Sequence, residues 1–127
     1  MPGTRSQTKN IVDTVQGYSS AAVTAAQILY EYVAPMFGRI GGIKVLAVTA
    51  GTGGGNTVCD VLLNGTTIWT TPANRPTLLA TSTGEFTNAV PDVRGIRPGD
   101  RITVQVASVS STGHARLMMT VALEGNA

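Results

Sequence analysis

An Asn-Gly dipeptide, Asn64-Gly65, lies between two short runs of β-forming residues, 57–63 and 67–71. A two-residue type I′ hairpin turn needs positive φ at both central residues, and Asn-Gly is the pair that most often accepts this conformation. Such a turn fixes the register of both strands, and side chains alternate between the two faces of each strand. The alternation before the turn predicts a core-facing row of Cys59, Val61 and Leu63, and an opposite row of Val58, Asp60 and Leu62.

Period-two alternation continues through most of the chain after residue 26. It predicts strands over residues 27–34, 38–50 and 101–109, a final strand after residue 114, and a short one near residues 85–90. The expected inward rows are Ile43, Val45 and Ala47; Ile102, Val104 and Val106; and Ala115, Leu117, Met119, Val121 and Leu123. Pro98-Gly99 predicts a turn. This pattern predicts that residues 26–127 form an all-β domain, an antiparallel β-sandwich or jelly roll.

Residues 1–25 differ from the rest and are expected to form an N-terminal arm. The first ten residues are polar and weakly basic, with Arg5 and Lys9. Ile11, Val15 and Tyr18 have helical spacing, which favours one or two helical turns. Gly17 weakens that helix, and an extended arm that orders on a neighbouring protein is an equal alternative.

Composition excludes several classes of function. Charged residues make up only 13% of the 127 residues, and the net charge is +2. The basic residues are dispersed, so no nucleic-acid partner is expected. No apolar run approaches the ~18 residues of a membrane-spanning helix, so no membrane contact is expected. Because the first ten residues lack an apolar stretch, we expect synthesis in a cytoplasm rather than secretion.

The residues that carry chemistry are few. With one cysteine, Cys59, and one histidine, His114, we expect no catalytic residue, metal ligand, cofactor or small-molecule substrate, and therefore no enzyme. Cys59 is expected to be a buried apolar residue, and His114 an exposed polar one. Asp60 needs a cationic partner if it is half-buried, either Arg75 or Arg101.

The ordered set of motifs from residue 59 onward resembles a structural module of tailed bacteriophages. The matching pieces are Cys59-Asp-Val61, Asn64 to Ile68, Arg75-Pro-Thr-Leu78, Pro91-Asp-Val93, Gly99-Asp-Arg-Ile-Thr-Val-Gln-Val106 and Gly113 to Leu123. The resemblance covers about residues 26–124. It implies a jelly-roll-like sandwich that often forms trimers in capsid decoration proteins, head fibres and the heads of tail fibres. Leu62 and Leu63 stand where such modules often carry polar residues, which gives this chain extra apolar surface.

The expected function is that of a virion structural protein. It would be a capsid decoration (cement) protein on the capsid exterior, binding the major capsid protein, assembling as a homotrimer and stabilising the head. The candidate interface residues are Arg5, Lys9, Ile11, Val15, Tyr18, Val58, Leu62, Trp69 and Met118. An alternative is a fibre or adhesin head that binds a host receptor, with Tyr30, Tyr32 and Trp69 as an aromatic platform for sugars. A minor tail or neck component is a third alternative.

Overall fold

The computed structural model describes residues 11–51, 56–79, 82, 86–87, 91–109 and 112–125. Ten strands and one short 3₁₀ helix make up the regular structure of these residues. They are β1 (Ile11–Ser19), β2 (Ile28–Val33), β3 (Gly38–Thr49), β4 (Thr57–Leu63), β5 (Thr66–Thr67), η1 (Pro72–Asn74), β6 (Thr77–Leu78), β7 (Phe86–Thr87), β8 (Gly95–Ile96), β9 (Arg101–Val109) and β10 (Ala115–Gly125).

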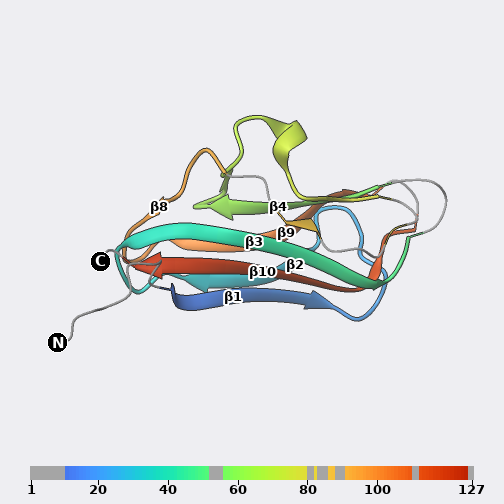
Figure 1. Cartoon of the computed structure of the whole chain (residues 1–127), viewed down its shortest axis with the longest axis horizontal. Helices are drawn as coiled ribbons and strands as arrows, with labels where there is room; N and C mark the ends of the chain where they lie inside the picture. Colours follow the sequence, from blue (N-terminus) through green and yellow to red (C-terminus); the bar gives the residue numbers. More distant parts are fainter. Residues whose placement is uncertain are drawn as a thin grey trace.

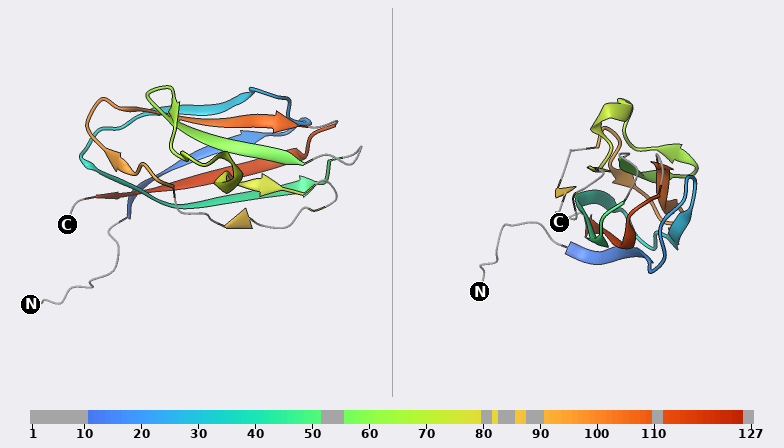
Figure 2. Two further views of the ribbon diagram at one scale, coloured as in Figure 1. Left: turned by 90° about the horizontal axis from the view of Figure 1, so that it is seen from above. Right: turned by 90° about the vertical axis from the view of Figure 1, so that its right-hand side faces the viewer.

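The strands form two antiparallel sheets that pack against each other (Figures 1 and 2). The first sheet has the order β1-β10-β3-β7, with β8 also paired to β3. The second has the order β2-β9-β4-β5, with β6 also paired to β4. The pairing is nested, because β1 pairs with β10, β2 with β9, β3 with β7 and β8, and β4 with β5 and β6. A long hairpin rolled up in this way is a jelly roll, and the predicted all-β antiparallel sandwich is confirmed.

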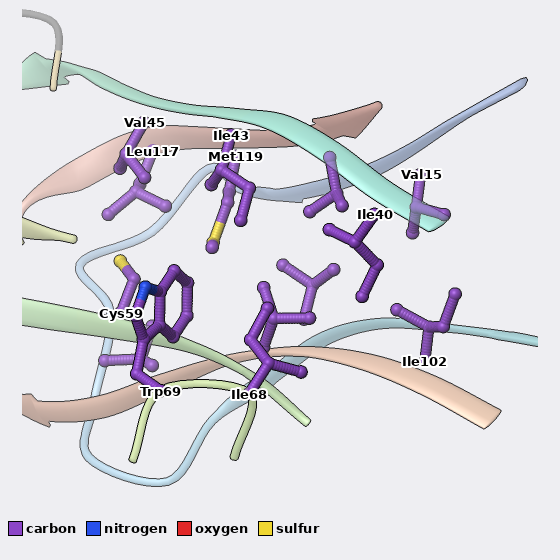
Figure 3. Close-up of a cluster of buried hydrophobic side chains, with 14 of the residues drawn as sticks. Val15, Ile40, Ile43, Val45, Cys59, Ile68, Trp69, Ile102, Leu117 and Met119 are labelled. Carbon is purple, nitrogen blue, oxygen red and sulfur yellow. The ribbon is translucent and has the colours of Figure 1, made fainter. Parts of the chain in front are cut away.

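The core lies between the two sheets and is built from the predicted inward rows. In Figure 3 the side chain of Val45 points from the first sheet toward Cys59 of the second, and that of Ile40 points toward Ile102. All four are fully buried. Burial of this kind is the main stabilising contribution, at about 25 cal/mol per Å² of apolar surface. Leu63, also predicted to face inward, is half-buried and packs against the edge of the core.

The Asn64-Gly65 turn has the predicted conformation, with φ of 53° at Asn64 and 88° at Gly65. It also holds the turn that precedes β9. The Asn64 amide N–H donates to the carbonyl oxygen of Arg101 (2.8 Å), and the Arg101 amide N–H donates to Asn64 Oδ1 (2.9 Å). Asn64 Nδ2 donates to Asp100 Oδ1 (3.1 Å), and Gly99 in that second turn has φ of 94°. These bonds therefore connect the hairpin turn to the turn before β9, in the second half of the chain.

The expectation of an arm through residue 25 is wrong for residues 11–19, which form an edge strand of the first sheet. Neither a helix nor a free arm forms there, because β1 pairs with β10 from Ile11 to Ser19 and buries Val15 in the core. Gly17 permits the packing, since a Cβ at this position would lie 2.6 Å from Leu29 Cβ. Residues 1–10, with Arg5 and Lys9, lie outside the described residues.

Replacing Gly65 tests the turn. Gly65→Ala should lower the free energy of unfolding by about 1–2 kcal/mol, because an L-residue is disfavoured at positive φ. Gly42→Ala is the matched control: Gly42 has no positive φ, and a Cβ there would meet nothing within 4 Å. Urea denaturation should show the loss only for Gly65→Ala, and equal effects of the two substitutions would contradict this account of the turn.

Candidate interaction surface

The outer face of the first sheet carries a row of large apolar side chains that crosses three strands. Tyr18 of β1 lies opposite Met118 of β10, and Met118 lies opposite Leu46 of β3. Tyr18 is 53% exposed, Leu46 is 41% exposed, and Met118 is half-buried. Val48, on the same face of β3, is 48% exposed. We call these four residues the outer-face patch. Its existence follows from alternation, since the neighbours Leu117 and Met119 point into the core.

The predicted interface residues Val58, Leu62 and Met118 do not lie on one surface. Val58 and Leu62 lie on β4 in the second sheet, whereas Met118 lies on the outside of the first. Both β4 residues are half-buried. Leu62 lies between Thr67 of β5 and Thr103 of β9. Two of the predicted interface residues are therefore on the face of the molecule opposite Met118.

Asp60, between Val58 and Leu62, is held by the loop that crosses this face. It accepts hydrogen bonds from Thr67 Oγ1 (2.7 Å) and from the Val61 amide (2.8 Å). Arg75 Nε lies 3.4 Å from Asp60 Oδ2, which confirms the expected ion pair with Arg75. Burial raises the pKa of the Asp60 carboxyl, and the Thr67, Arg75 and Val61 interactions oppose that rise. In Figure 1 the loop that contains η1 lies over β4. The bonds of Asp60 to Thr67 and Arg75 therefore fasten this loop to the sheet.

Val15 and Trp69, two other predicted interface residues, are fully buried in the core. Trp69 is one of the core side chains between the two sheets (Figure 3), so it forms no exposed aromatic platform with Tyr30 and Tyr32. Ile11 is the first residue of β1. Tyr18 and Met118 are thus the two predicted interface residues that the structure brings together, and Leu46 and Val48 join them. Sheet pairing brings Leu46 there, and a single sequence does not show which strands pair.

His114 is fully buried, so the expectation that it is exposed is wrong. Its Nε2 lies 3.0 Å from the carbonyl oxygen of Leu79 and 2.9 Å from that of Ser82. Two carbonyl acceptors require a proton on Nε2, and in the neutral tautomer that carries it there Nδ1 accepts from the Thr57 hydroxyl at 2.7 Å. His114 therefore joins the starts of β4 and β10 to the segment after β6. A polar residue after a turn gives no sign of these partners.

A groove of about 440 Å³ lies between the two sheets at the β1 and β2 edges, lined by Asp13, Thr14, Gln16, Tyr30 and Tyr32. The Tyr32 hydroxyl donates to Asp13 Oδ2 (2.7 Å), and the Thr14 amide donates to Asp13 Oδ1 (2.8 Å). These two bonds, the Tyr32 bond first, lower the pKa of the Asp13 carboxyl. The same bond to Asp13 raises the pKa of Tyr32 to about 12. We call this site the seam groove.

The described residues bring together no group of three or more His, Cys, Asp or Glu side chains that could hold a metal ion. The Cys59 thiol is buried, which raises its pKa to about 12 and keeps it protonated. Within the described part of the chain, no helix is long and apolar enough to cross a membrane. No family model matches this chain, and a search of curated proteins finds no relative.

The buried histidine generates a stability prediction. Thr57→Val removes the hydroxyl that donates to His114 Nδ1 but keeps the volume of the side chain. The free energy of unfolding should fall by about 1–3 kcal/mol, because a buried acceptor loses its partner. Thr49→Val, at an exposed position of β3, should change it by less than about 0.5 kcal/mol. Chemical denaturation measures both, and a neutral Thr57→Val would rule out a stabilising role for this bond.

The bond across the seam groove generates a pH prediction. In Tyr32→Phe the pKa of Asp13 should rise toward its ordinary value, because the main donor to the ionised carboxylate is gone. Since the folded-state pKa of Asp13 is depressed, its contribution to stability is present above the unfolded-state pKa and is lost as the pH falls through the folded-state pKa. Carboxyl-carbon NMR titration measures the shift. Tyr30→Phe, which removes no bond to Asp13, should leave it unchanged.

Proposed function

We propose that this protein is a structural component of a bacteriophage virion, a capsid decoration protein that binds the outer capsid lattice and stabilises the head. The outer-face patch would be its contact with the major capsid protein. The proposal includes self-association as a homotrimer on the particle exterior, which a native-mass measurement tests.

The observation that carries the proposal is the outer-face patch itself. Two of its side chains, Tyr18 and Val48, are about half-exposed. A contiguous apolar surface of this kind marks a contact with another protein, and Tyr and Met are enriched in such contacts. The patch lies on three hydrogen-bonded strands, so its backbone is held in place before binding and loses little conformational freedom.

Two further observations support an assembly role. The jelly-roll topology is one that viral capsid domains use. The order of motifs from Cys59 to Leu123 resembles the phage module, and the strands β4, β5, β9 and β10 occupy those motifs. His114 and Asp60, two of the buried polar residues, are engaged in holding the fold together.

A second candidate function is receptor binding by a fibre or adhesin head. The seam groove favours it, because two tyrosines and three polar side chains meet there. This candidate predicts binding to host cells through Tyr30 and Tyr32, whereas the decoration proposal predicts binding to capsids through Leu46 and Val48.

Capsid binding by matched variants tests the proposal. The double variant Leu46→Thr/Val48→Thr keeps β-forming residues but removes apolar surface from the patch. Its affinity for empty capsids of the encoding phage should fall at least tenfold, a loss of about 1.4 kcal/mol of binding free energy. Val33→Thr makes the same change at a residue that is 64% exposed on β2, outside the patch, and should leave affinity within about twofold.

Co-sedimentation with capsids measures these affinities, and heat release of the genome measures head stabilisation. Absence of capsid binding by the unaltered protein would overturn the decoration role. Equal binding by the double variant and by Val33→Thr would show that the outer-face patch is not the contact.

A further inference from the structure

We propose that the seam groove is a binding site for neutral saccharides. This inference names the ligand class of the receptor-binding candidate and is independent of capsid binding. The site lies on the β1 and β2 edges, and its residues do not include Leu46, Val48 or Met118 of the outer-face patch.

The geometry of the groove suits a sugar ring. Tyr30 and Tyr32 are two residues apart on β2, which places their Cα atoms about 7 Å apart. Tyr30 is 47% exposed, so its ring is available to a ligand, and Tyr32 is held by its bond to Asp13. A volume of about 440 Å³ lies within the usual range of small-molecule sites, about 300–1,000 Å³.

The two walls of the groove have complementary chemistry. The electron-rich face of a tyrosine ring attracts the weakly positive C–H groups on one side of a pyranose. The wall from β1 offers the Gln16 amide and the Thr14 hydroxyl, each able to donate and to accept, and the Asp13 carboxylate, which only accepts. Sugar hydroxyls also donate and accept, so vicinal hydroxyls can bond to these groups while the ring contacts tyrosine.

Charge restricts the ligand to a neutral one. The interactions that lower the pKa of Asp13 keep its carboxylate ionised at neutral pH. Among the described residues, no basic side chain lines the groove, so a sialic acid or a phosphate would meet repulsion from Asp13 without compensation from them. Aromatic rings also favour a quaternary ammonium as ligand. Both Asp13 oxygens already accept hydrogen bonds, however, and two of the five lining side chains are neutral polar groups. The groove therefore favours a neutral sugar over a quaternary ammonium.

Titrations followed by amide NMR spectra test the inference. The probes are D-glucose, D-galactose, N-acetyl-D-glucosamine and L-rhamnose, with N-acetylneuraminic acid and choline as charged counterparts. At least one neutral sugar at millimolar concentration should shift the amides of residues 13–16 and 30–32. Tyr30→Ala and Gln16→Ala should each weaken that sugar at least tenfold. Tyr18→Ala, an exposed tyrosine of β1 outside the groove, should bind it like the unaltered protein.

Several results would overturn the inference. These are the absence of shifts with every neutral sugar, stronger binding of N-acetylneuraminic acid or choline, and sugar binding that survives in both Tyr30→Ala and Gln16→Ala. Gln16→Ala keeps the inference testable even if Tyr30→Ala does not fold. Gln16 is an exposed side chain on an edge strand, and removing that side chain leaves the core intact. Because Tyr30 and Gln16 are outside the patch, loss of sugar binding with intact capsid binding separates this inference from the decoration role.

Discussion

Nested antiparallel pairing around the Asn64-Gly65 turn is the constraint on which the rest of the structure depends. Asn64 is the central residue of the 127-residue chain, and each strand before it pairs with a strand after it. Such pairing brings together segments far apart in sequence, as when β1 meets β10. The entropy lost in closing these long loops is recovered only when both sheets bury the core. The bonds from Asn64 to Asp100 and Arg101 hold the two halves together where the chain reverses.

Alternation in the sequence was enough to predict much of the interior of the sandwich, although not the burial of Val15, Trp69 and His114. Ile102, Val104 and Val106 are fully buried as expected, because a one-residue slip would place their polar neighbours in the core. The sequence also narrowed the cationic partner of Asp60 to Arg75 or Arg101, since a buried carboxylate requires a cation, and the structure shows that it is Arg75. These predictions succeed where a local pattern determines the environment of a residue.

Predictions that depended on contacts between distant segments failed or were incomplete. The strand β1 was missed because Ile11, Val15 and Tyr18 also fit a helix, and only pairing with β10 decides between the two. The environment of His114 depends on backbone carbonyls more than 30 residues away, which no side-chain pattern reveals. Half of the outer-face patch was predicted from the sequence, because Tyr18 and Met118 were among the candidate interface residues. Leu46 lies beside them only because β3 pairs with β10, which the sequence does not show.

The two proposed surfaces meet at β1, which gives Tyr18 to the outer-face patch and Gln16 to the seam groove. Hydroxyl-radical footprinting of the protein, free and bound to capsids, tests the central claim most directly, because it reports the exposure of individual side chains. The account predicts that oxidation of Tyr18, Leu46 and Met118 falls on binding, while that of the exposed Phe37 and Leu79 is unchanged. Protection of Phe37 or Leu79, with Tyr18 and Leu46 still reactive, would contradict it.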